Sequence, residues 1–570
     1  MSNRPIRFFH RGAIVEVDGV QPTRTVLEWL REDARCTGTK EGCNEGDCGA
    51  CTTVIGTLAP ADDPEAVRGL ALHPVNACIQ FLPTLDGKAL FTVEDLQAIQ
   101  AGCRHGLPGV QVGLAGTDAV AGGASHLAGG AAHPGNGAAH AARADLHPVQ
   151  QAMVECHGSQ CGFCTPGFVM SLWSAYERGR ACGAPPTRRQ LADALSGNLC
   201  RCTGYRPILD AGARMFELPA AALDTAPVVA ALEAMRDDAP LLCASALGRF
   251  EAPRSLDGLA AARLERPAAT LLAGSTDIGL WITKQFRDLP DLLSLGAVAE
   301  LKRIERRDGV LLIGAGASLE VAFTALAVEW PSLEEVWLRF ASVPIRNAGT
   351  MGGNIANGSP IGDSAPVLMA LDAQVELRRG GDVRVLPLAG FYVDYMKNRL
   401  QPGEFVQALR VPLGSAAQVR AYKMSKRYDC DISAVCAGLA IERDSDDTVT
   451  AARFAFGGMA ATVRRAAGAE AAVLGRPWSL ETVQAAQRAL ADEFEPLTDM
   501  RASAAYRMTV AQNLLRRYWL ETRAIEPLAA AELSVWSVAA DPPARAGRAV
   551  VRHDTPERIR SRWNRNDEQA

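Results

Sequence analysis

The sequence has 570 residues, which is long enough for three or four domains that each bury a core of their own. Its 59 basic and 64 acidic side chains leave a net charge of −5, a balance that gives no indication of nucleic-acid binding. No uninterrupted apolar run approaches the roughly 20 residues of a membrane span, and charged residues interrupt the N-terminal segment. We therefore expect a cytoplasmic protein without a membrane partner.

The first predicted domain surrounds a glycine-rich loop. A strand and turn at AIVEVDGV (13–20) and a short helix at TVLEWLRED (25–33) come first, and the loop KEGCNEGDCGAC (40–51) leads into a strand at CTTVIGTL (51–58). This order of elements resembles a β-grasp ferredoxin domain over residues 1–95.

The cysteines of this domain have a diagnostic spacing. The chain has 15 cysteines and no secretion signal, so metal ligation is a better first hypothesis for them than disulfides. Cys43, Cys48 and Cys51, with Cys78 further on in NACIQF, match the plant-type ferredoxin pattern for a [2Fe–2S] cluster. The intervening glycines let the loop turn its N–H groups toward sulfur. A zinc site and free core cysteines are the alternatives, and Cys36, outside the pattern, is expected to be buried.

An insert rich in Gly, Ala and His follows. The glycines and Pro134 oppose a persistent helix, so we expect a flexible linker over 96–147. Metal binding is the alternative, because four histidines recur at seven-residue intervals: His126, His133, His140 and His147.

A second group of cysteines lies in a region that we predict to be helical, over residues 148–218. CHGSQCGFCTPG contains Cys161 and Cys164, and GNLCRCTGYRP contains Cys200 and Cys202. Each pair comes just before the start of a predicted helix, where the positive end of the helix dipole favours an anionic thiolate cluster. We expect a four-helix domain with a second [2Fe–2S] cluster, and a four-cysteine zinc site is the alternative.

The helix boundaries of this region follow from capping signals. Pro148 lies in the first turn of one helix, and Thr165 and Pro166 are the expected N-cap and first residue of another that runs to about Arg180. Two further helices are expected, one capped by Thr187 that stops at Gly197 and one opened by Pro207.

Beyond a linker at 219–240, residues 241–413 contain two glycine-rich segments. LLAGSTDIGL (271–280) reads as a strand, a turn and a helix start that can present N–H groups to a pyrophosphate. GTMGGNIANGSPIGDSAP (349–366) reads as a second glycine-rich loop. Between them VLLIGAGASLEVAF lacks the third small residue of a dinucleotide fingerprint, because Leu319 occupies that position, so we reject a Rossmann site there.

Taken in order, these motifs resemble the xanthine dehydrogenase family of molybdenum flavoproteins, in particular the separate small chain of bacterial two-chain enzymes. The resemblance covers about 1–100, 146–218 and 241–525. It implies a multidomain α+β fold in which a vanillyl-alcohol-oxidase-type FAD domain at 241–413 precedes a smaller α/β domain at 418–525, similar to the C-terminal domain of CO dehydrogenase flavoproteins. Residues 526–570 would form a flexible tail.

The resemblance also implies cofactor-binding residues. Two segments would line the phosphates and ribityl chain of FAD, three single residues would touch the cofactor, and Phe340 would shield one face of the isoalloxazine. The two segments are Leu271, Leu272, Ala273, Gly274, Ser275, Thr276, Asp277 and Ile278, and Thr350, Met351, Gly352, Gly353 and Asn354; the single residues are Asp363, Leu409 and Lys423.

Read from the residues alone, two of these assignments have alternatives. Phe340 could be a core residue, although Arg339 before it and VPIRN after it favour a partly exposed segment, and Lys423 could be a solvated lysine. The run KMSKRYDCDIS (423–433) is similar to a charged family loop that influences nicotinamide access, but Tyr428 and Cys430 interrupt its acidic residues.

The implied function is electron transfer within a xanthine dehydrogenase. Electrons from purine hydroxylation at a molybdopterin cofactor on a partner large subunit would pass through two [2Fe–2S] clusters to FAD and then as hydride to NAD+, in a heterotetramer of two small and two large chains. The alternatives are the iron–sulfur/FAD chain of another molybdenum hydroxylase, for aldehydes or aromatic substrates, and a non-catalytic iron–sulfur redox sensor.

Overall fold

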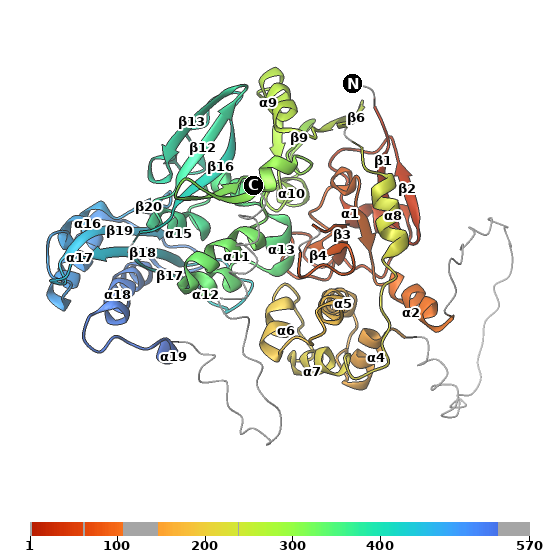
Figure 1. The fold of residues 1–570 in the computed structure, drawn as a ribbon, viewed down its shortest axis with the longest axis horizontal. Coiled ribbons are helices and arrows are strands. Elements are labelled where there is room, and N and C mark those ends of the chain that lie inside the picture. Colours follow the sequence, from red (N-terminus) through yellow and green to blue (C-terminus); the bar gives the residue numbers. More distant parts are fainter. Residues whose placement is uncertain (1–2, 61–62, 106–145, 238, 416, 534–570) are drawn as a thin grey trace. The chain divides into compact units, whose positions relative to one another are not determined.

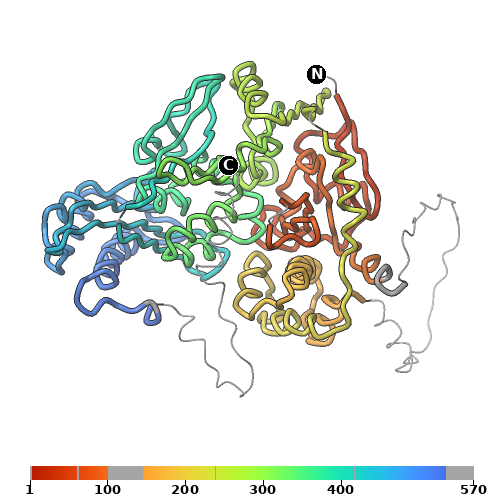
Figure 2. Tube along the Cα trace, in the orientation of Figure 1, coloured from red at the N-terminus to blue at the C-terminus, as the bar shows by residue number. Residues whose placement is uncertain are grey.

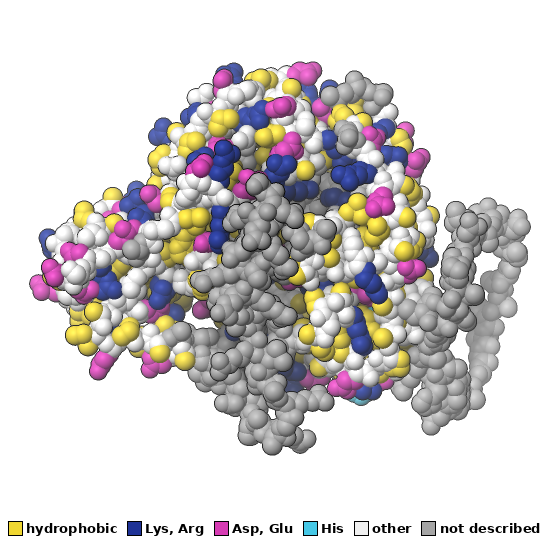
Figure 3. All heavy atoms as spheres, viewed as in Figure 1, with side chains coloured by type: hydrophobic (Ala, Val, Ile, Leu, Met, Phe, Trp, Pro, Cys, Tyr) yellow, Lys and Arg dark blue, Asp and Glu magenta, His cyan; other side chains and the backbone are white. Residues whose placement is uncertain are grey.

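The computed structural model describes residues 3–60, 63–105, 146–237, 239–415 and 417–533. Two compact units divide the chain. The N-terminal unit comprises Met1–Glu251, Ser275–Leu292 and Val343–Ile345, and the C-terminal unit comprises Ala252–Gly274, Leu293–Ser342 and Arg346–Ala570. Within the described ranges we find no helix with the length and apolar content needed to span a lipid bilayer. Basic and acidic side chains are interspersed over the face drawn in Figure 3.

The N-terminal unit opens with a five-stranded sheet in the order β2-β1-β5-β3-β4. Only β1 and β5 run parallel; the other neighbours are antiparallel. A capping box between Thr25 and Glu28 begins the predicted helix, which continues as a π-helical turn. The elements are β1 (Ile6–His10), β2 (Ala13–Val17), α1 (Val26–Glu28), the turn Trp29–Asp33, β3 (Thr52–Leu58), β4 (Leu70–Asn76), β5 (Ala89–Phe91) and α2 (Asp95–His105).

Helix α5 packs on β3 and β4 of this sheet, and the helices α4 and α6 pack on α5 (Figure 1). The buried Trp173 of α5 contacts Phe91 of β5, with ring centroids 5.3 Å apart. The helix after them, α8, packs on β1 and β3. The elements are α4 (Pro148–Glu155), α5 (Thr165–Ala181), α6 (Arg188–Ala194), α7 (Arg206–Arg214), α8 (Ala226–Ala234), β6 (Leu241–Ser245), β7 (Gly248–Ala252) and α10 (Ile278–Thr283).

Two predicted helix ends differ from the structure. Cys164, not Thr165, is the N-cap of α5, because Thr165 already has helical geometry and its hydroxyl bonds Ser159 instead of a backbone N–H. Helix α6 ends at Ala194, before Gly197. The N–H of Leu195 donates to the carbonyls of both Leu191 and Ala192, which is typical of the last turn of a helix. The cap predicted at Thr187 is confirmed: its hydroxyl accepts the N–H of Gln190.

His147 is the one regularly spaced histidine within the described residues; His126, His133 and His140 lie outside them. Its ring is buried, and its Nδ1 accepts the N–H of Val149 at 3.3 Å, which caps α4. Burial lowers the pKa of His147 to about 4, so the ring stays neutral and able to accept. This histidine therefore has a structural role at a helix start.

The C-terminal unit is built around an antiparallel sheet in the order β10-β11-β16-β12-β13. Gly314 at the end of β11 packs on the chain, since a Cβ there would lie 2.3 Å from the Leu301 carbonyl. The rejected dinucleotide motif thus marks a close backbone contact. The elements are α9 (Leu256–Glu265), β8 (Thr270–Leu272), β9 (Asp291–Ser294), β10 (Ile304–Arg307), β11 (Val310–Gly314), α11 (Leu319–Glu329), α12 (Glu334–Arg339), α13 (Val343–Ala348), α14 (Met351–Asn357), α15 (Ser364–Ala370), β12 (Gln374–Arg379), β13 (Asp382–Pro387), β14 (Tyr392–Asp394), β15 (Lys397–Asn398) and β16 (Phe405–Pro412).

This unit also contains a second antiparallel sheet, β17-β18-β19-β20. Figure 2 traces the path of the chain by residue number. Helix α15 packs on β18 and β19, and Gly438 permits this approach because a Cβ there would lie 2.2 Å from the Pro366 carbonyl. The elements are β17 (Gln418–Met424), β18 (Val435–Arg443), β19 (Val449–Gly457), β20 (Arg464–Arg465), α16 (Ala467–Val473), α17 (Leu480–Glu493), α18 (Ala504–Thr522) and α19 (Ala530–Leu533). The predicted tail at 526–570 lies largely outside the described residues.

Candidate functional site

The structure brings the first four predicted cysteines together. Three come from the loop between the π-helical turn and β3, and Cys78 follows β4. The thiols of Cys43 and Cys48 are within hydrogen-bond reach, as are those of Cys51 and Cys78, and Cys43 also interacts electrostatically with Cys78. Cys36 is buried, as expected. These four sulfurs form what we call the ferredoxin-type set.

Backbone N–H groups point at the sulfurs of this set. Cys43 Sγ accepts the N–H of Asp47 at 3.4 Å and that of Cys48 at 3.3 Å, and Cys48 Sγ accepts the N–H of Cys43 at 3.3 Å. The hydrogen bond from the Cys48 thiol lowers the pKa of Cys43 to about 5; the backbone amides act in the same direction, and burial opposes them. The same thiol contact raises the pKa of Cys48. A Cβ at Gly42 would lie 2.7 Å from Cys48 Sγ, so the loop closes on sulfur without side-chain bulk.

The four cysteines of the helical region also converge. Cys164 is within hydrogen-bond reach of Cys200, and Cys161 of Cys202. Burial, with the Cys200 contact, raises the pKa of Cys164 to about 12. Cys200 is itself partly desolvated, but bonds from the hydroxyl and N–H of Thr203 and from the N–H of Cys202 outweigh that effect and lower its pKa. We call these sulfurs the helical set.

Both cysteine pairs of the helical set precede helix starts, as predicted: one pair precedes α5 and the other α7. The thiols of Cys161 and Cys202 are exposed, whereas Cys200 is buried. One side of the helical set, formed by Cys161 and Cys202, is therefore open to solvent.

The two cysteine loops interlock within the N-terminal unit. The Leu199 N–H donates to the Cys48 carbonyl at 3.0 Å, and the Asn198 side-chain amide donates to the Gly49 carbonyl at 3.1 Å. A Cβ at Gly49 would lie 2.1 Å from the Gly197 carbonyl, so only glycine fits this contact. Sequence reasoning missed Asn198, and its position beside Cys200 was the only signal for it.

These observations test whether the residues fit iron–sulfur clusters. Each set supplies four thiols, and both place amide donors on sulfur, an arrangement typical of [2Fe–2S] ligands. Among the residues that the structure describes, no group of three or more His, Cys, Asp or Glu side chains is arranged to hold a single metal ion. The donor sets fit clusters.

The two glycine-rich segments meet within the C-terminal unit, where Leu271–Gly274 leads out of β8. A Cβ at Gly274 would lie 2.0 Å from the Ala348 carbonyl, and one at Gly353 would lie 3.5 Å from the Ala273 Cβ. The bare backbone of these segments fits a cradle for a phosphate-bearing cofactor.

The prediction that 349–366 is a loop throughout is wrong, because Met351–Asn357 forms helix α14. The Thr350 hydroxyl accepts the Gly353 N–H at 3.0 Å and starts the helix, Gly352 packs tightly on Ala315, and Gly358 ends it in a left-handed conformation. Capping and packing thus outweigh the low helix propensity of the two glycines.

Residues Ser275, Thr276, Asp277 and Ile278 belong to the N-terminal unit and form the turn that starts α10. Ser275 has a positive φ of 65° and a buried side chain, and its Oγ has no hydrogen-bond partner among the described residues. A buried unpaired hydroxyl at this turn fits a site that a ligand completes.

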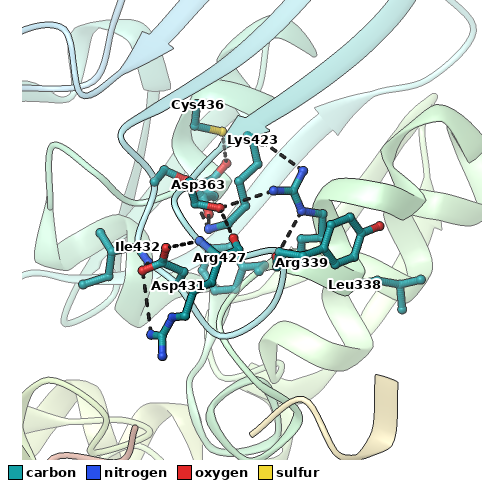
Figure 4. A network of polar contacts seen from close by, with 12 residues as sticks. Leu338, Arg339, Asp363, Lys423, Arg427, Asp431, Ile432 and Cys436 are labelled. Carbon is teal, nitrogen blue, oxygen red and sulfur yellow. Dashed lines mark hydrogen bonds and ion pairs between the residues drawn. The ribbon is translucent and has the colours of Figure 1, made fainter. Parts of the chain in front are cut away.

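Asp363 and Lys423 form a buried ion pair, drawn in Figure 4. Lys423 Nζ lies 2.6 Å from Asp363 Oδ2 and 3.1 Å from the Ser433 hydroxyl, which in turn donates to Asp363 Oδ1. The lysine is only 3% exposed, so the reading of Lys423 as a solvated residue is wrong. Ser433, which completes the pair, carried no signal in the sequence.

Phe340 itself is a buried core residue, and the segment around it is partly exposed, as expected, because half-buried and buried residues alternate from Arg339 to Asn347. Its ring packs on Phe323 with centroids 5.4 Å apart, and its carbonyl accepts a bond from the buried guanidinium of Arg346 at 2.9 Å. Arg346, the charged residue that follows Phe340, therefore points inward and donates to backbone carbonyls. Leu409 is likewise fully buried, in β16 opposite Ile313.

Arg339 holds the charged run 423–433 in place. Its guanidinium donates to the carbonyls of Lys423 at 2.9 Å and Tyr428 at 3.2 Å, and it lies 4.6 Å from the centre of the Tyr428 ring (Figure 4). Sequence reasoning used Arg339 only as a sign of exposure and missed this role. The loop is thus tied to the residue next to Phe340.

Four family models match the chain. They are a 2Fe-2S iron–sulfur cluster binding domain at 8–82, a [2Fe-2S] binding domain at 136–213, the FAD binding domain in molybdopterin dehydrogenase at 246–414 and the CO dehydrogenase flavoprotein C-terminal domain at 420–522. These matches confirm the predicted multidomain α+β architecture, two iron–sulfur domains and a flavin domain.

Curated relatives are longer than this chain. A xanthine dehydrogenase of Emericella nidulans is 30% identical over 576 residues, which cover 90% of this chain and 38% of the relative. Aldehyde oxidase 4 of Cavia porcellus is 26% identical over 90% of this chain and 39% of its own length. The chain thus spans less than two fifths of these relatives.

Solved structures resemble part of the chain. A carbon monoxide dehydrogenase chain from Hydrogenophaga pseudoflava is 28% identical with a TM-score of 0.45, covering 47% of this chain and 94% of that one. A quinoline 2-oxidoreductase chain from Pseudomonas putida 86 is 22% identical with a TM-score of 0.45, covering 49% of this chain and 97% of that one.

Proposed function

We infer that this chain, which belongs to the molybdenum hydroxylase family by its four domains, is the small, electron-carrying subunit of a xanthine dehydrogenase. Electrons from hydroxylation of hypoxanthine or xanthine would enter at the helical set, pass to the ferredoxin-type set and FAD, and leave as hydride to NAD+. The observation that carries this proposal is the backbone hydrogen bond from Leu199 to Cys48, which joins the two cysteine loops directly.

The residues of this chain would hold and insulate the groups that carry the electrons. Cys43, Cys48, Cys51 and Cys78 would bind one [2Fe–2S] cluster, and the helical set the other. The amides of the ferredoxin-type loop donate to sulfur and so stabilise the thiolate form of the ligands. Bound clusters supply single-electron transfer, and bound FAD supplies the exchange between single electrons and hydride.

The flavin would lie along the two glycine-rich segments. Leu271–Gly274 and Thr350–Asn354 would present backbone to its phosphates. Asp363, Lys423, Leu409 and Phe340 would complete the site: the buried ion pair positions β17 against the start of α15, and Phe340 would face the ring system.

A partner would supply the molybdopterin cofactor. That partner would be a molybdenum-binding large subunit, in an assembly of two small and two large chains. The exposed thiols of Cys161 and Cys202 favour docking of that partner at the helical set.

The substrate would be bound by the partner, so a second candidate is a hydroxylase of aldehydes or aromatic heterocycles. The likeness to an aldehyde oxidase favours it. The purine assignment has the support of the xanthine dehydrogenase at 30% identity.

Co-purification tests the proposal. The chain should carry FAD and two distinguishable iron–sulfur EPR signals, and it should elute with a molybdenum subunit that gives xanthine-dependent NAD+ reduction. Turnover of aldehydes or quinolines without xanthine turnover would favour the second candidate. Colourless protein, without iron or flavin after anaerobic reconstitution, would contradict both.

A further inference from the structure

Helix α10 ends against the ferredoxin-type loop, although the two are far apart in the sequence. Lys284, the C-cap of α10, donates from Nζ to the Cys43 carbonyl at 2.5 Å. The same ammonium lies 3.7 Å from the carboxylate of Glu45. The ammonium group of Lys284 is therefore hydrogen-bonded to the backbone of Cys43, a predicted cluster ligand.

Close packing fixes α10 in this position. A Cβ at Gly279 would lie 2.8 Å from both the carbonyl oxygen and the Cβ of Ile79, the residue that follows Cys78. A Cβ at Gly46, inside the cysteine loop, would lie 3.1 Å from Ile345. The loop is thus held on two sides, and the stem of Lys284 starts from an anchored helix.

The loop itself is acidic. Glu41, Glu45 and Asp47 surround Cys43 in the sequence, against the single cation Lys40. Lys40 donates to the Thr37 carbonyl, three residues back, and not to a cysteine. Lys284 is therefore a counter-charge that the fold, and not the local sequence, delivers to the Cys43 peptide.

We propose that Lys284 is a positioning residue that raises the reduction potential of the cluster held by the ferredoxin-type set. Reduction adds one negative charge to a cluster, and a cation fixed at a ligand peptide stabilises that charge, whereas Glu45 opposes it. A higher reduction potential makes this cluster easier to reduce. Helix α10, which carries Lys284, follows the turn that we predict to contact the FAD phosphates. This inference rests on the proposed function, because it requires a cluster at these four cysteines.

The test is an EPR-monitored redox titration of the full-length, reconstituted chain. Lys284→Met should lower the potential of one iron–sulfur signal and leave the other unchanged, and Lys284→Glu should lower it further. Lys284→Arg should keep the potential near that of the wild type. Glu45→Gln should shift the same signal upward, which checks the electrostatics without touching Lys284.

A matched control removes an equal charge elsewhere. Lys397→Met deletes a lysine that pairs with Asp394 in the β14–β15 hairpin of the C-terminal unit, and it should shift neither signal. Since the Lys284 side chain is 41% exposed, the Lys284→Met shift should shrink as ionic strength rises.

Two outcomes separate the inference from the proposed function. Equal potentials for wild type, Lys284→Met and Glu45→Gln, with both clusters present by iron content and visible absorbance, would overturn the role of Lys284 alone. Absence of two iron–sulfur signals in the wild type would instead contradict the proposed function.

Discussion

The two cysteine sets have the same number of thiols but differ in exposure. In the ferredoxin-type set Cys51 and Cys78 are buried and Cys43 and Cys48 are half-buried, whereas in the helical set Cys161 and Cys202 are exposed. An exposed redox centre can exchange electrons with a partner, and an enclosed one is better suited to pass them on within the chain. The proposed direction, with entry at the helical set and transfer inward, relies on this contrast.

The largest expected effect separates the two sets outright. Cys78→Ser should remove or alter one EPR signal and leave the other, and Cys161→Ser should do the reverse, because the ligands of each set are grouped apart. EPR of dithionite-reduced protein checks both. If each variant leaves both signals intact, the ligand assignments are wrong.

A smaller effect tests the interlock between the loops. Gly49→Ala forces a Cβ within 2.1 Å of the Gly197 carbonyl at a φ of +69°, and we expect a loss of about 3–5 kcal/mol in the free energy of unfolding. Urea denaturation measures it.

Gly162→Ala is the matched control in the helical set. Its φ is +84°, but a Cβ there meets nothing within 4 Å, so only backbone strain of about 1–2 kcal/mol is expected. Equal losses for the two variants would show that the Gly49 contact is not tight.

The third prediction concerns Glu177 of α5, which links the two regions. Its side chain is fully buried, and it accepts the Leu223 N–H at 3.0 Å and lies 3.4 Å from Arg68 of the β3–β4 connection. Burial, offset in part by these partners, raises the pKa of Glu177 to about 7. The folded state therefore keeps a proton that the unfolded state releases near pH 4.5.

Stability should consequently fall as pH rises from about 4.5 to 7, by on the order of 3 kcal/mol from this group. Glu177→Gln should remove that part of the slope while keeping an acceptor for Leu223. Thermal unfolding at several pH values checks it, and an identical slope in the variant would contradict the assignment.

The smallest effect is expected from the insert that separates the two regions in the sequence. Deleting residues 104–143 should change the free energy of unfolding by about 1 kcal/mol or less, because closure entropy varies slowly with loop length. Both clusters and FAD should remain. Loss of a cluster or of bound metal on deletion would show that the histidine-rich insert is more than a linker.

What the sequence predicted depended on local spacing. Three cysteines of the ferredoxin-type set share one loop, the helical set consists of two close pairs, and the cap at Thr187 is local, so these features were recognisable without a fold. Contacts between distant segments were not: Lys284 meets Cys43 across 241 residues and Asn198 meets Gly49 across 149.

Burial was also hidden. Lys423 stands among charged residues, and its burial depends on Asp363 and Ser433, which only the tertiary structure brings to it. In the same way, the packing of Gly352 on Ala315 turns a glycine-rich run into a helix.

The most direct test of the electron-carrying role is anaerobic reduction of the isolated, FAD-replete chain by NADH, followed by EPR. Hydride would enter at the flavin and electrons would reach the clusters in the reverse of the proposed direction, so both iron–sulfur signals should develop, and no xanthine turnover should occur until the molybdenum subunit is added. Clusters that dithionite reduces but NADH never does, in protein shown to hold FAD, would contradict the account.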